Sequence, residues 1–282
     1  MQTIRRLESL GPAIQMLREG GGRVALVPTM GALHEGHMAL FAAARHRAER
    51  VVASIFVNPL QFGPNEDFAR YPRREAKDQT MLAEAGVDLL WMPPVEEMYR
   101  PDAATIVSVA GVSDPFDGAH RPGHFDGVAT VVAKLFLQVR PDVALFGEKD
   151  WQQLQVIRRM VTDLDMGIEI VGVPTQRADD GLALSSRNAY LAPEDRARAV
   201  VLPRALGEAA RTIERGGDAA QAVADATRLL AGAGFAVDYL ALADAETLGP
   251  PAPGRPRRLV AAARLGATRL IDNLPVAADS GH

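Results

Sequence analysis

Residues 23–37 have the sequence RVALVPTMGALHEGH, in which an apolar run is followed directly by a turn with a glycine and by the start of a helix. The run Arg23 to Val27 predicts a buried strand, and the helix is expected to begin near Gly36. The first turn of such a helix carries free N–H groups and the positive end of the helix dipole, which suit phosphate. This stretch therefore predicts a strand–turn–helix unit with an anion site at its turn.

Short apolar runs alternate with helical stretches through the first two-thirds of the chain. Further strands are predicted at Val51 to Val57, Asp88 to Trp91 and Asp142 to Phe146, and helices at Gly36 to Glu49, Pro72 to Ala85 and Phe125 to Val139. This alternation predicts an α/β fold, a Rossmann-like doubly wound parallel sheet with helices on both faces. Ligands of such sheets bind at the carboxyl ends of the strands, where the strand order reverses.

The composition changes after a connecting segment at residues 174–188, which is rich in turn-forming residues. Helices are predicted at Pro193 to Arg215 and Asp218 to Ala231, and strands at Phe235 to Ala241, Leu259 to Ala263 and Thr268 to Ile271. The stretch Gly249 to Pro256 contains four prolines and predicts a surface loop. We therefore expect a first domain at residues 1–175 and a smaller α+β domain at residues 176–282.

The overall composition narrows the class of protein. The chain has 282 residues, 48% of them hydrophobic and 23% charged, with a formal net charge of −4. This charge gives no basic field for nucleic acid. The absence of cysteine excludes disulfides, thiolate metal sites and cysteine nucleophiles. No signal peptide and no membrane-spanning run are predicted, so we expect a cytoplasmic protein that binds neither nucleic acid nor a membrane.

His34 and His37 are the first candidate functional residues. They lie three positions apart, so they share one face of a helical turn, and Gly36 leaves space for a ring or a phosphate near the backbone. Two alternative roles stay open: the pair could bind a metal, or both could be polar residues at a helix start. The segment has neither the GxxxxGK[ST] nor the GxGxxG pattern, which removes the usual basis for a kinase or a dehydrogenase.

Polar residues also follow two other predicted strands. Asn58 and Gln61 come after the second strand, where neutral amides suit a carboxylate that must stay nucleophilic; a hydrogen-bonded Asn-Pro turn is the alternative. Lys149 and Asp150 come after the strand at residues 142–146, and Gln153 lies about one helical turn farther on. Lysine occurs only three times in this arginine-rich chain, so Lys149 stands out as a candidate phosphate contact. A solvated charged loop is the alternative at residues 148–150.

The segment Leu184-Ser185-Ser186-Arg187-Asn188 lies in the connecting region. Its two hydroxyls and its guanidinium offer several hydrogen-bond donors to a triphosphate, although an N-cap for the following helix is the alternative. Because the segment joins the two expected domains, it could close over a nucleotide when the second domain moves.

These motifs resemble a known family. His34-x-Gly36-His37 resembles the signature of the HxGH nucleotidyltransferase superfamily, which includes class I aminoacyl-tRNA synthetases. The longer string at residues 28–37 resembles the pantothenate synthetase family. Strings at residues 56–62, 123–128, 146–150, 184–188, 261–264 and 268–273 extend this resemblance over nearly the whole chain.

The resemblance implies a role for each matching position. The ATP-binding residues would be Met30, Gly31, His34, Gly36, His37, Gly147, Glu148, Lys149, Asp150, Gln176, Leu184, Ser185, Ser186 and Arg187. Of these, His34, His37 and Lys149 would be catalytic, with His37 as an acid or a charge stabiliser. Gln61, Gln153 and Asn58 would bind pantoate or β-alanine, and Val131 and Val132 would face the gem-dimethyl group of pantoate. Position 176 is often valine in the family and is glutamine here, so its contact is expected to run through the backbone.

The implied activity is an ATP-dependent ligation in two steps. Pantoate would attack the α-phosphate of ATP to give pantoyl-adenylate and pyrophosphate, and β-alanine would then displace AMP to form pantothenate. ATP would be a substrate together with Mg²⁺, for which Asp78 is a possible ligand, and a homodimer is implied. No general base for the β-alanine amine stands out in the sequence.

Two alternatives stay open at this point. One is a nucleotidyltransferase that acts on another small acid or on a phosphate; the other is an ATP-binding regulatory module without chemistry. Gln61 and Gln153 favour a second-substrate pocket, which a module that only binds ATP does not need.

Overall fold

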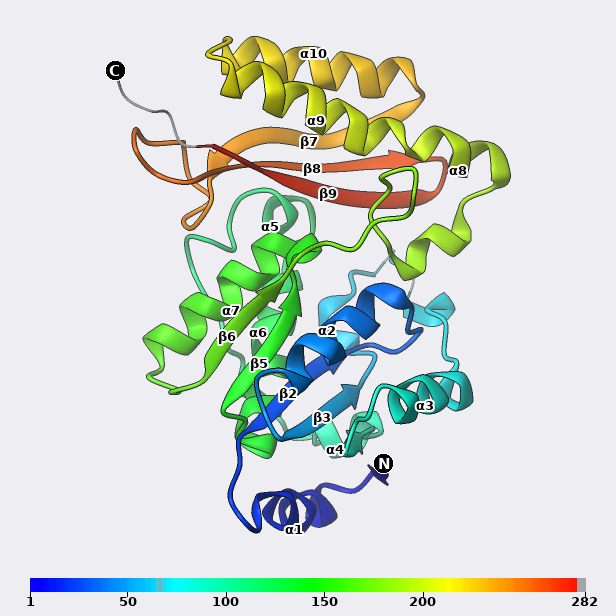
Figure 1. Ribbon diagram of the computed structural model, residues 1–282, viewed down its shortest axis with the longest axis vertical. Helices are drawn as coiled ribbons and strands as arrows, with labels where there is room; N and C mark the ends of the chain where they lie inside the picture. The colour runs from blue at the N-terminus through cyan, green and yellow to red at the C-terminus, as the bar shows by residue number, and fades with distance from the viewer. Residues whose placement is uncertain (65, 67, 278–282) are drawn as a thin grey trace.

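The computed structural model describes residues 1–64, 66 and 68–277, which form two β-sheets stacked along the long axis of the molecule (Figure 1). The larger sheet lies in the N-terminal part and the smaller one in the C-terminal part. Among the described residues, no helix combines the length and the apolar composition that a bilayer span requires.

The larger sheet has six parallel strands in the order β1-β4-β3-β2-β5-β6. Their bounds are β1 (Gln2–Ile4), β2 (Val24–Thr29), β3 (Arg50–Ile55), β4 (Leu89–Trp91), β5 (Val143–Gly147) and β6 (Glu169–Val173). Strand β2 lies in the middle, with Ala25 paired to Val51 of β3 and to Val143 of β5. From β2 the chain builds outward through β3 and β4, then returns to build β5 and β6 on the other side. The strand order therefore reverses between β2 and β5.

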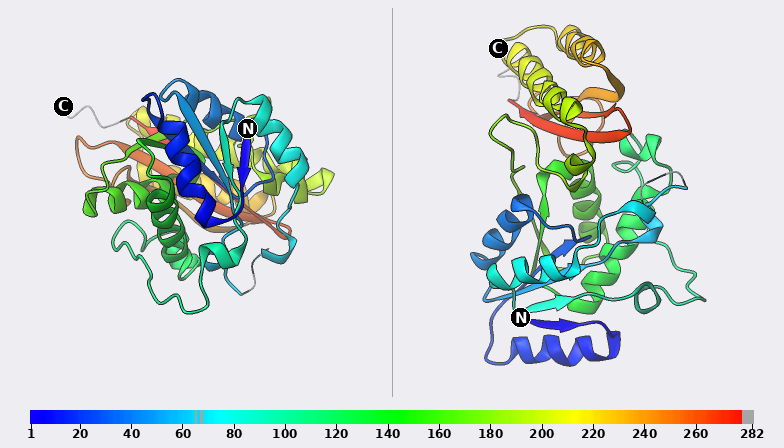
Figure 2. Two further views of the ribbon diagram at one scale, coloured as in Figure 1. Left: turned by 90° about the horizontal axis from the view of Figure 1, so that it is seen from below. Right: turned by 90° about the vertical axis from the view of Figure 1, so that its right-hand side faces the viewer.

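Helices cover both faces of this sheet (Figures 1 and 2). They are α1 (Leu7–Arg18), α2 (Glu35–Arg45), α3 (Glu75–Glu84), α4 (Val95–Met98), α5 (Asp117–His120), α6 (His124–Val139) and α7 (Trp151–Asp163), with 3₁₀ turns η1 (Pro59–Gln61), η2 (Phe68–Arg70) and η3 (Glu148–Asp150). Neighbouring residues of β2 face opposite cores, as the strand period requires. Ala25 and Val27 pack in the core that contains α2 and α3, while Val24 and Leu26 pack in the core that contains α1, α6 and α7.

The smaller sheet is antiparallel, with the order β7 (Phe235–Asp244), β8 (Arg257–Leu265) and β9 (Thr268–Val276). It is preceded by η4 (Ser186–Tyr190), α8 (Pro193–Ala199), α9 (Val201–Glu214) and α10 (Ala219–Gly232). Helices α9 and α10 pack on the face that points away from the larger sheet, and together they enclose a separate hydrophobic core (Figure 1). The predicted fold class is confirmed; the domain boundary between residues 175 and 176 stays a prediction.

Several elements differ from those predicted. Strands β1 and β6 and helices α1 and α7 were not predicted from the sequence. Helix α1 contains Gly11 and Pro12, a pair that signals a turn more often than a helix interior. The single helix predicted at residues 193–215 is two helices, α8 and α9. Pro203 explains the break, because it has no N–H for the carbonyl of Ala199 and is tolerated only in the first turn of a new helix.

The turn between β2 and α2 is held by a buried carboxylate on α3. Asp78 is 1% exposed, and its two oxygens accept the backbone N–H groups of Ala32 and Leu33, each at 2.9 Å. Gly31 and Ala32 both have positive φ, so this turn is one that local preference alone would not select. The expectation that Asp78 could help to bind Mg²⁺ stays a prediction, although each of its oxygens already accepts a backbone N–H of the turn.

We predict that Asp78→Ala destabilises the fold by about 2–4 kcal/mol, because it leaves two backbone donors without a partner at a buried site. Asp78→Asn should destabilise the fold less, since the asparagine side chain keeps one oxygen that can accept a backbone N–H. Glu84→Gln, at an exposed position of the same helix, is the matched control. Urea unfolding followed by circular dichroism measures the three variants; a loss below about 0.5 kcal/mol in Asp78→Ala would contradict this role.

Candidate active site

A cavity of about 230 Å³ opens at the carboxyl edge of the larger sheet, where the strand order reverses. The segments after β2 and β5 form its floor, η1 and α6 form one wall, and residues 174–176 and 184–187 form the other. Segments that are far apart in the sequence thus meet at one place.

Most of the predicted site residues line this cavity. They are Met30, His34, Gly36, His37, Asn58, Gln61, Val131, Val132, Gly147, Lys149, Asp150, Gln153, Gln176, Leu184, Ser185, Ser186 and Arg187. Gly31, Glu148 and Asp78 are not part of its lining. Gly31 lies in the turn that Asp78 holds, with φ of 80°, and an added Cβ there would come within 3.0 Å of the Asp78 carboxylate.

A second, larger cavity of about 880 Å³ adjoins the first beneath the smaller sheet. The two share lining residues, among them Met30, Gln61 and Lys149. Ligand pockets usually measure about 300–1,000 Å³, so the smaller cavity alone is tight for a nucleotide, whereas the two together have room for ATP and a small acid. We place the chemistry in the smaller cavity, because both histidines lie there and neither lines the larger one.

The two histidines begin α2 as a reciprocal cap. The Nδ1 atom of His34 accepts the backbone N–H of Gly36 at 3.1 Å, and the Nδ1 atom of His37 accepts the backbone N–H of His34 at 3.3 Å. An added Cβ at position 36 would lie 2.9 Å from the His34 ring, so only glycine allows this ring to lie on the backbone. Because each Nδ1 is an acceptor, each neutral ring carries its proton on Nε2.

Both rings have a pKa below that of an ordinary histidine, which favours their neutral form at neutral pH. Burial lowers the pKa of His34, with a further contribution from the nearby Lys149 charge. Burial, His34 and Lys149 together lower the pKa of His37 to about 3. The pair therefore presents uncharged Nε2–H donors at a helix N-terminus, and this favours charge stabilisation over acid catalysis by His37. Within the described part of the chain, no group of three or more His, Asp or Glu residues is placed to hold a metal.

Lys149 supplies a positive charge to the site, as does Arg187. It lies on η3 directly after β5, and its ammonium makes no ion pair with any residue that the structure describes. The amide of Asn273 on β9 donates to the backbone carbonyls of Glu148 and Lys149, each at 2.9 Å. The smaller sheet thus fixes the backbone that carries this lysine.

Glu148 does not line the smaller cavity, and its expected contact with ATP stays a prediction. Its carboxylate pairs with Arg258 of β8 at 3.1 Å. Arg258 also lies over the Trp151 ring, 3.4 Å from its centroid. This carboxylate therefore ties the two sheets together and is engaged by the smaller sheet, outside the cavity that Lys149 lines.

Asn58 supports the site through hydrogen bonds to its neighbours. It is 1% exposed, and its amide donates to Gln61 Oε1 at 3.2 Å and to the Gly127 carbonyl at 3.0 Å. Its carbonyl oxygen accepts from Leu60 N–H and from the Tyr99 hydroxyl. The predicted contact between Asn58 and substrate stays a prediction. Asn58 orients Gln61, whose own amide NH₂ donates to the Met30 sulfur at 3.2 Å.

The remaining walls combine apolar and polar groups. Val131 and Val132 are buried on α6 and line the cavity, and Gln153 enters it from the first turn of α7. Tyr71 was not predicted from the sequence, because it follows no predicted strand; its hydroxyl lies 3.4 Å from Ser186 Oγ. This pair connects the first domain to the segment at residues 184–187.

The segment at residues 184–187 is ordered by local hydrogen bonds. Leu184 N–H donates to the carbonyl of Gln176 at 2.9 Å, while the Gln176 side chain is exposed and donates to the Pro174 carbonyl. Ser185 caps η4 by accepting the N–H of Arg187 at 3.2 Å, whereas the N-cap of the predicted helix, now α8, is Ala192, whose side chain makes no capping bond. The expectation that Gln176 contacts a ligand through its backbone stays a prediction.

A helix N-terminus, neutral histidine donors and the Lys149 ammonium, all at the switch point of a doubly wound sheet, define the class of protein: an α/β enzyme built to hold a nucleotide phosphate. Similarity to known proteins identifies the family within this class. The family model described as pantoate-beta-alanine ligase matches residues 2–275. The chain therefore belongs to the pantoate–β-alanine ligase family.

Individual relatives agree with this assignment. A pantothenate synthetase of Rhizorhabdus wittichii is 64% identical over 98% of this chain and 99% of its own length. A crystal structure of pantothenate synthetase from Thermus thermophilus matches 97% of this chain and 99% of its own, with 52% identity and a TM-score of 0.92. A pantoate-beta-alanine ligase from Francisella tularensis, in complex with beta-gamma ATP and beta-alanine, matches 98% of this chain and 97% of its own, at 31% identity and a TM-score of 0.83.

The lowered histidine pKa values predict how stability depends on pH. Since the pKa of His37 is about 3 in the folded state and about 6.5 when unfolded, the unfolded chain binds one more proton between these values. The contribution of the neutral His37 ring to the free energy of unfolding is then complete above about pH 6.5 and decreases as the pH falls below this value. Urea unfolding at several pH values from 4.5 to 7.5 should show this slope. His37→Gln should reduce the slope by about one proton, or about 1.4 kcal/mol per pH unit; an unchanged slope would contradict a neutral His37.

Proposed function

We propose that this chain, a ligase by its family, makes pantothenate in two steps through a pantoyl-adenylate intermediate. In the first step the carboxylate of pantoate attacks the α-phosphate of ATP and pyrophosphate leaves. In the second step the amine of β-alanine attacks the acyl carbon, an amide forms and AMP leaves. The observation that carries this proposal is the meeting of a phosphate-binding helix start with two neutral amides, Gln61 and Gln153, in one cavity.

In the first step, the site would need to bind the pantoate carboxylate without lowering its nucleophilicity. Gln61 and Gln153 can bind the carboxylate and hydroxyls of pantoate through neutral hydrogen bonds, which leaves the carboxylate nucleophilic. Val131 and Val132 offer an apolar surface to its gem-dimethyl group. The acid would then lie beside the phosphate groups rather than be paired with a cation.

The charge that builds on the phosphate oxygens would be stabilised by groups already in place. These are Lys149, the Nε2–H groups of His34 and His37, and the segment Ser185 to Arg187. Such preorganised donors act strongly in a site that excludes water. A bound phosphate would also raise the pKa of both histidines, which strengthens their hydrogen bonds to it.

Mg²⁺ enters this proposal with ATP. The described residues offer no cluster of carboxylates for it, and each oxygen of Asp78 already accepts a backbone N–H. Mg²⁺ usually keeps several waters and binds substrate phosphates with few protein ligands, so the triphosphate itself would carry the ion. It would then add to the charge stabilisation by Lys149.

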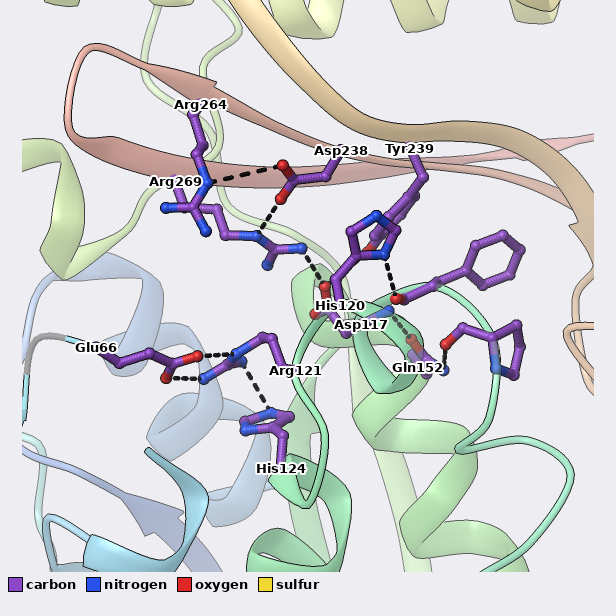
Figure 3. A network of polar contacts seen from close by, with 12 residues as sticks. Glu66, Asp117, His120, Arg121, His124, Gln152, Asp238, Tyr239, Arg264 and Arg269 are labelled. Carbon is purple, nitrogen blue, oxygen red and sulfur yellow. Dashed lines mark hydrogen bonds and ion pairs between the residues drawn. The ribbon is translucent and has the colours of Figure 1, made fainter. Parts of the chain in front are cut away.

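The smaller sheet would act as a lid, with residues 176–282 as the lid domain. It covers the larger cavity and is tied to the first domain by Asn273 and by the Glu148–Arg258 pair. A second tie joins Asp117 of α5 to Arg269 at 2.6 Å and to the Tyr239 hydroxyl at 3.0 Å (Figure 3). A closed lid would protect the adenylate from water. The homodimer and the cytoplasmic location stay predictions.

Two other functions were open from the sequence, and one assay separates all three. ATP–pyrophosphate exchange that requires pantoate, followed by AMP and pantothenate formation when β-alanine is added, is expected here. Exchange with a different small acid alone would indicate another nucleotidyltransferase. Nucleotide binding without exchange or AMP formation would indicate a regulatory module and overturn the proposal.

We predict that His37→Ala and Lys149→Ala each lower the pantoate-dependent exchange rate by about 10²–10³-fold, because each removes one donor from the phosphate site. Lys77→Ala is the matched control, since Lys77 is exposed on α3, away from both cavities. Its exchange rate should stay within about twofold of the unmodified protein. Circular dichroism verifies that each variant is folded, and near-normal exchange in His37→Ala or Lys149→Ala contradicts the assigned role.

A further inference from the structure

The segment that carries Gln61 lies directly on the first turns of α6. An added Cβ at Gly127 would come within 2.4 Å of the Leu60 carbonyl oxygen and 2.7 Å of the Gln61 nitrogen, so only glycine permits this backbone contact. The Asn58 amide donates to the carbonyl of Gly127 across the same contact. The first turns of α6 therefore pack directly against η1 and fix its position.

His124, the first residue of α6, holds the other side of Gln61. Its Nδ1 lies 2.8 Å from the backbone carbonyl oxygen of Gln61, and its side chain is buried. The guanidinium of Arg121 reaches the same carbonyl more weakly, at 3.4 Å. The backbone of Gln61 is thus fixed through His124, while its side chain is fixed through Asn58.

The neighbours of His124 set its tautomer. Arg121 Nη1 lies 3.0 Å from His124 Nε2, and a guanidinium can only donate, so Nε2 is the acceptor and Nδ1 carries the proton. Arg121 is itself oriented by two hydrogen bonds to the carboxylate of Glu66, at 2.6 and 2.7 Å (Figure 3). Burial and the Arg121 charge lower the pKa of His124 to about 4, so the ring is neutral. His124 is therefore a fixed donor aimed at Gln61.

We propose that His124 is a positioning residue for pantoate: through the backbone carbonyl of Gln61 it sets where the Gln61 amide meets the substrate, with Arg121 and Glu66 holding its ring. This inference rests on the proposed binding of pantoate by Gln61. It gives a role to the motif at residues 123–128, whose glycine and histidine both contact the substrate-binding segment. A small displacement of a binding group reduces the rate strongly, because the reacting atoms must be aligned.

The test compares three substitutions at position 124 in the full chain. Asn places an amide near the position of Nδ1 and can still donate to the Gln61 carbonyl, Gln places its amide near Nε2, and Phe keeps the ring without a donor. We expect kcat/KM for pantoate in the exchange reaction to fall about 10–100-fold in His124→Phe and His124→Gln, and by less than about threefold in His124→Asn. The KM for ATP should change less than the KM for pantoate in all three, because His124 does not line the smaller cavity that His34, His37 and Lys149 line.

A double-mutant cycle with Gln61→Ala tests whether His124 acts through Gln61. If it does, His124→Phe should change kcat/KM for pantoate by less than about twofold once the Gln61 side chain is gone. Independent roles would instead multiply the two effects. Equal loss in the Asn, Gln and Phe variants, or an equal rise in the KM for ATP, would show a general structural role and overturn the inference.

Failure of the inference is distinguishable from failure of the proposed function. Gln61→Ala with an unchanged KM for pantoate would remove Gln61 from the pantoate site. Gln61→Ala with a raised KM, beside a normal His124→Phe, would leave that site intact and reject only the role of His124. If His124→Phe does not fold, the comparison of the Asn and Gln variants decides, since both keep a polar amide at this position.

Discussion

The reversal of strand order between β2 and β5 is the constraint on which the rest of the structure depends. Both strands are parallel and adjacent, yet α2 packs on one face of the sheet and α7 on the other. The segments that leave the two strands must therefore diverge, and the space between them is open to a ligand. His34 and His37 approach this space from one side, and Lys149 and Gln153 from the other.

The site is held in position mainly by bonds between side chains and backbone. Asp78 fixes the turn after β2, the histidines cap their own helix, and Asn273 fixes the carbonyls beside Lys149. Each of these groups forms hydrogen bonds to the backbone, and so fixes a neighbouring group that can bind the substrate. Such preorganisation lowers the reorganisation needed when charge develops on the phosphate. It also explains why the charged residues Glu148 and Asp78 lie behind the site rather than in it.

The elements that repeat a simple pattern could be predicted from the sequence, whereas those that depend on distant partners could not. The alternation of apolar runs with helical stretches predicted the parallel sheet, and polar residues after the strands predicted part of the cavity lining. The resemblance to the family supplied other lining residues, such as Met30, Val131 and Gly147. The role of Asp78 could not be foreseen, because its partners lie more than forty positions earlier in the chain. The ion pair of Glu148 could not be foreseen for the same reason, since Arg258 becomes its neighbour only when the two sheets stack. Helix α1 was not predicted and holds Pro12 in its interior, while the helix predicted at residues 193–215 ran through Pro203, which lies in the first turn of α9.

The central claim is that the switch point holds the α-phosphate of ATP against the carboxylate of pantoate. A crystal structure of the protein with pantoate and a non-hydrolysable ATP analogue tests this claim most directly. We predict phosphate oxygens within hydrogen-bond distance of His37 Nε2 and Lys149 Nζ, and the carboxylate of pantoate between Gln61 and Gln153. A nucleotide whose phosphates lie in the larger cavity, away from both histidines, would contradict it.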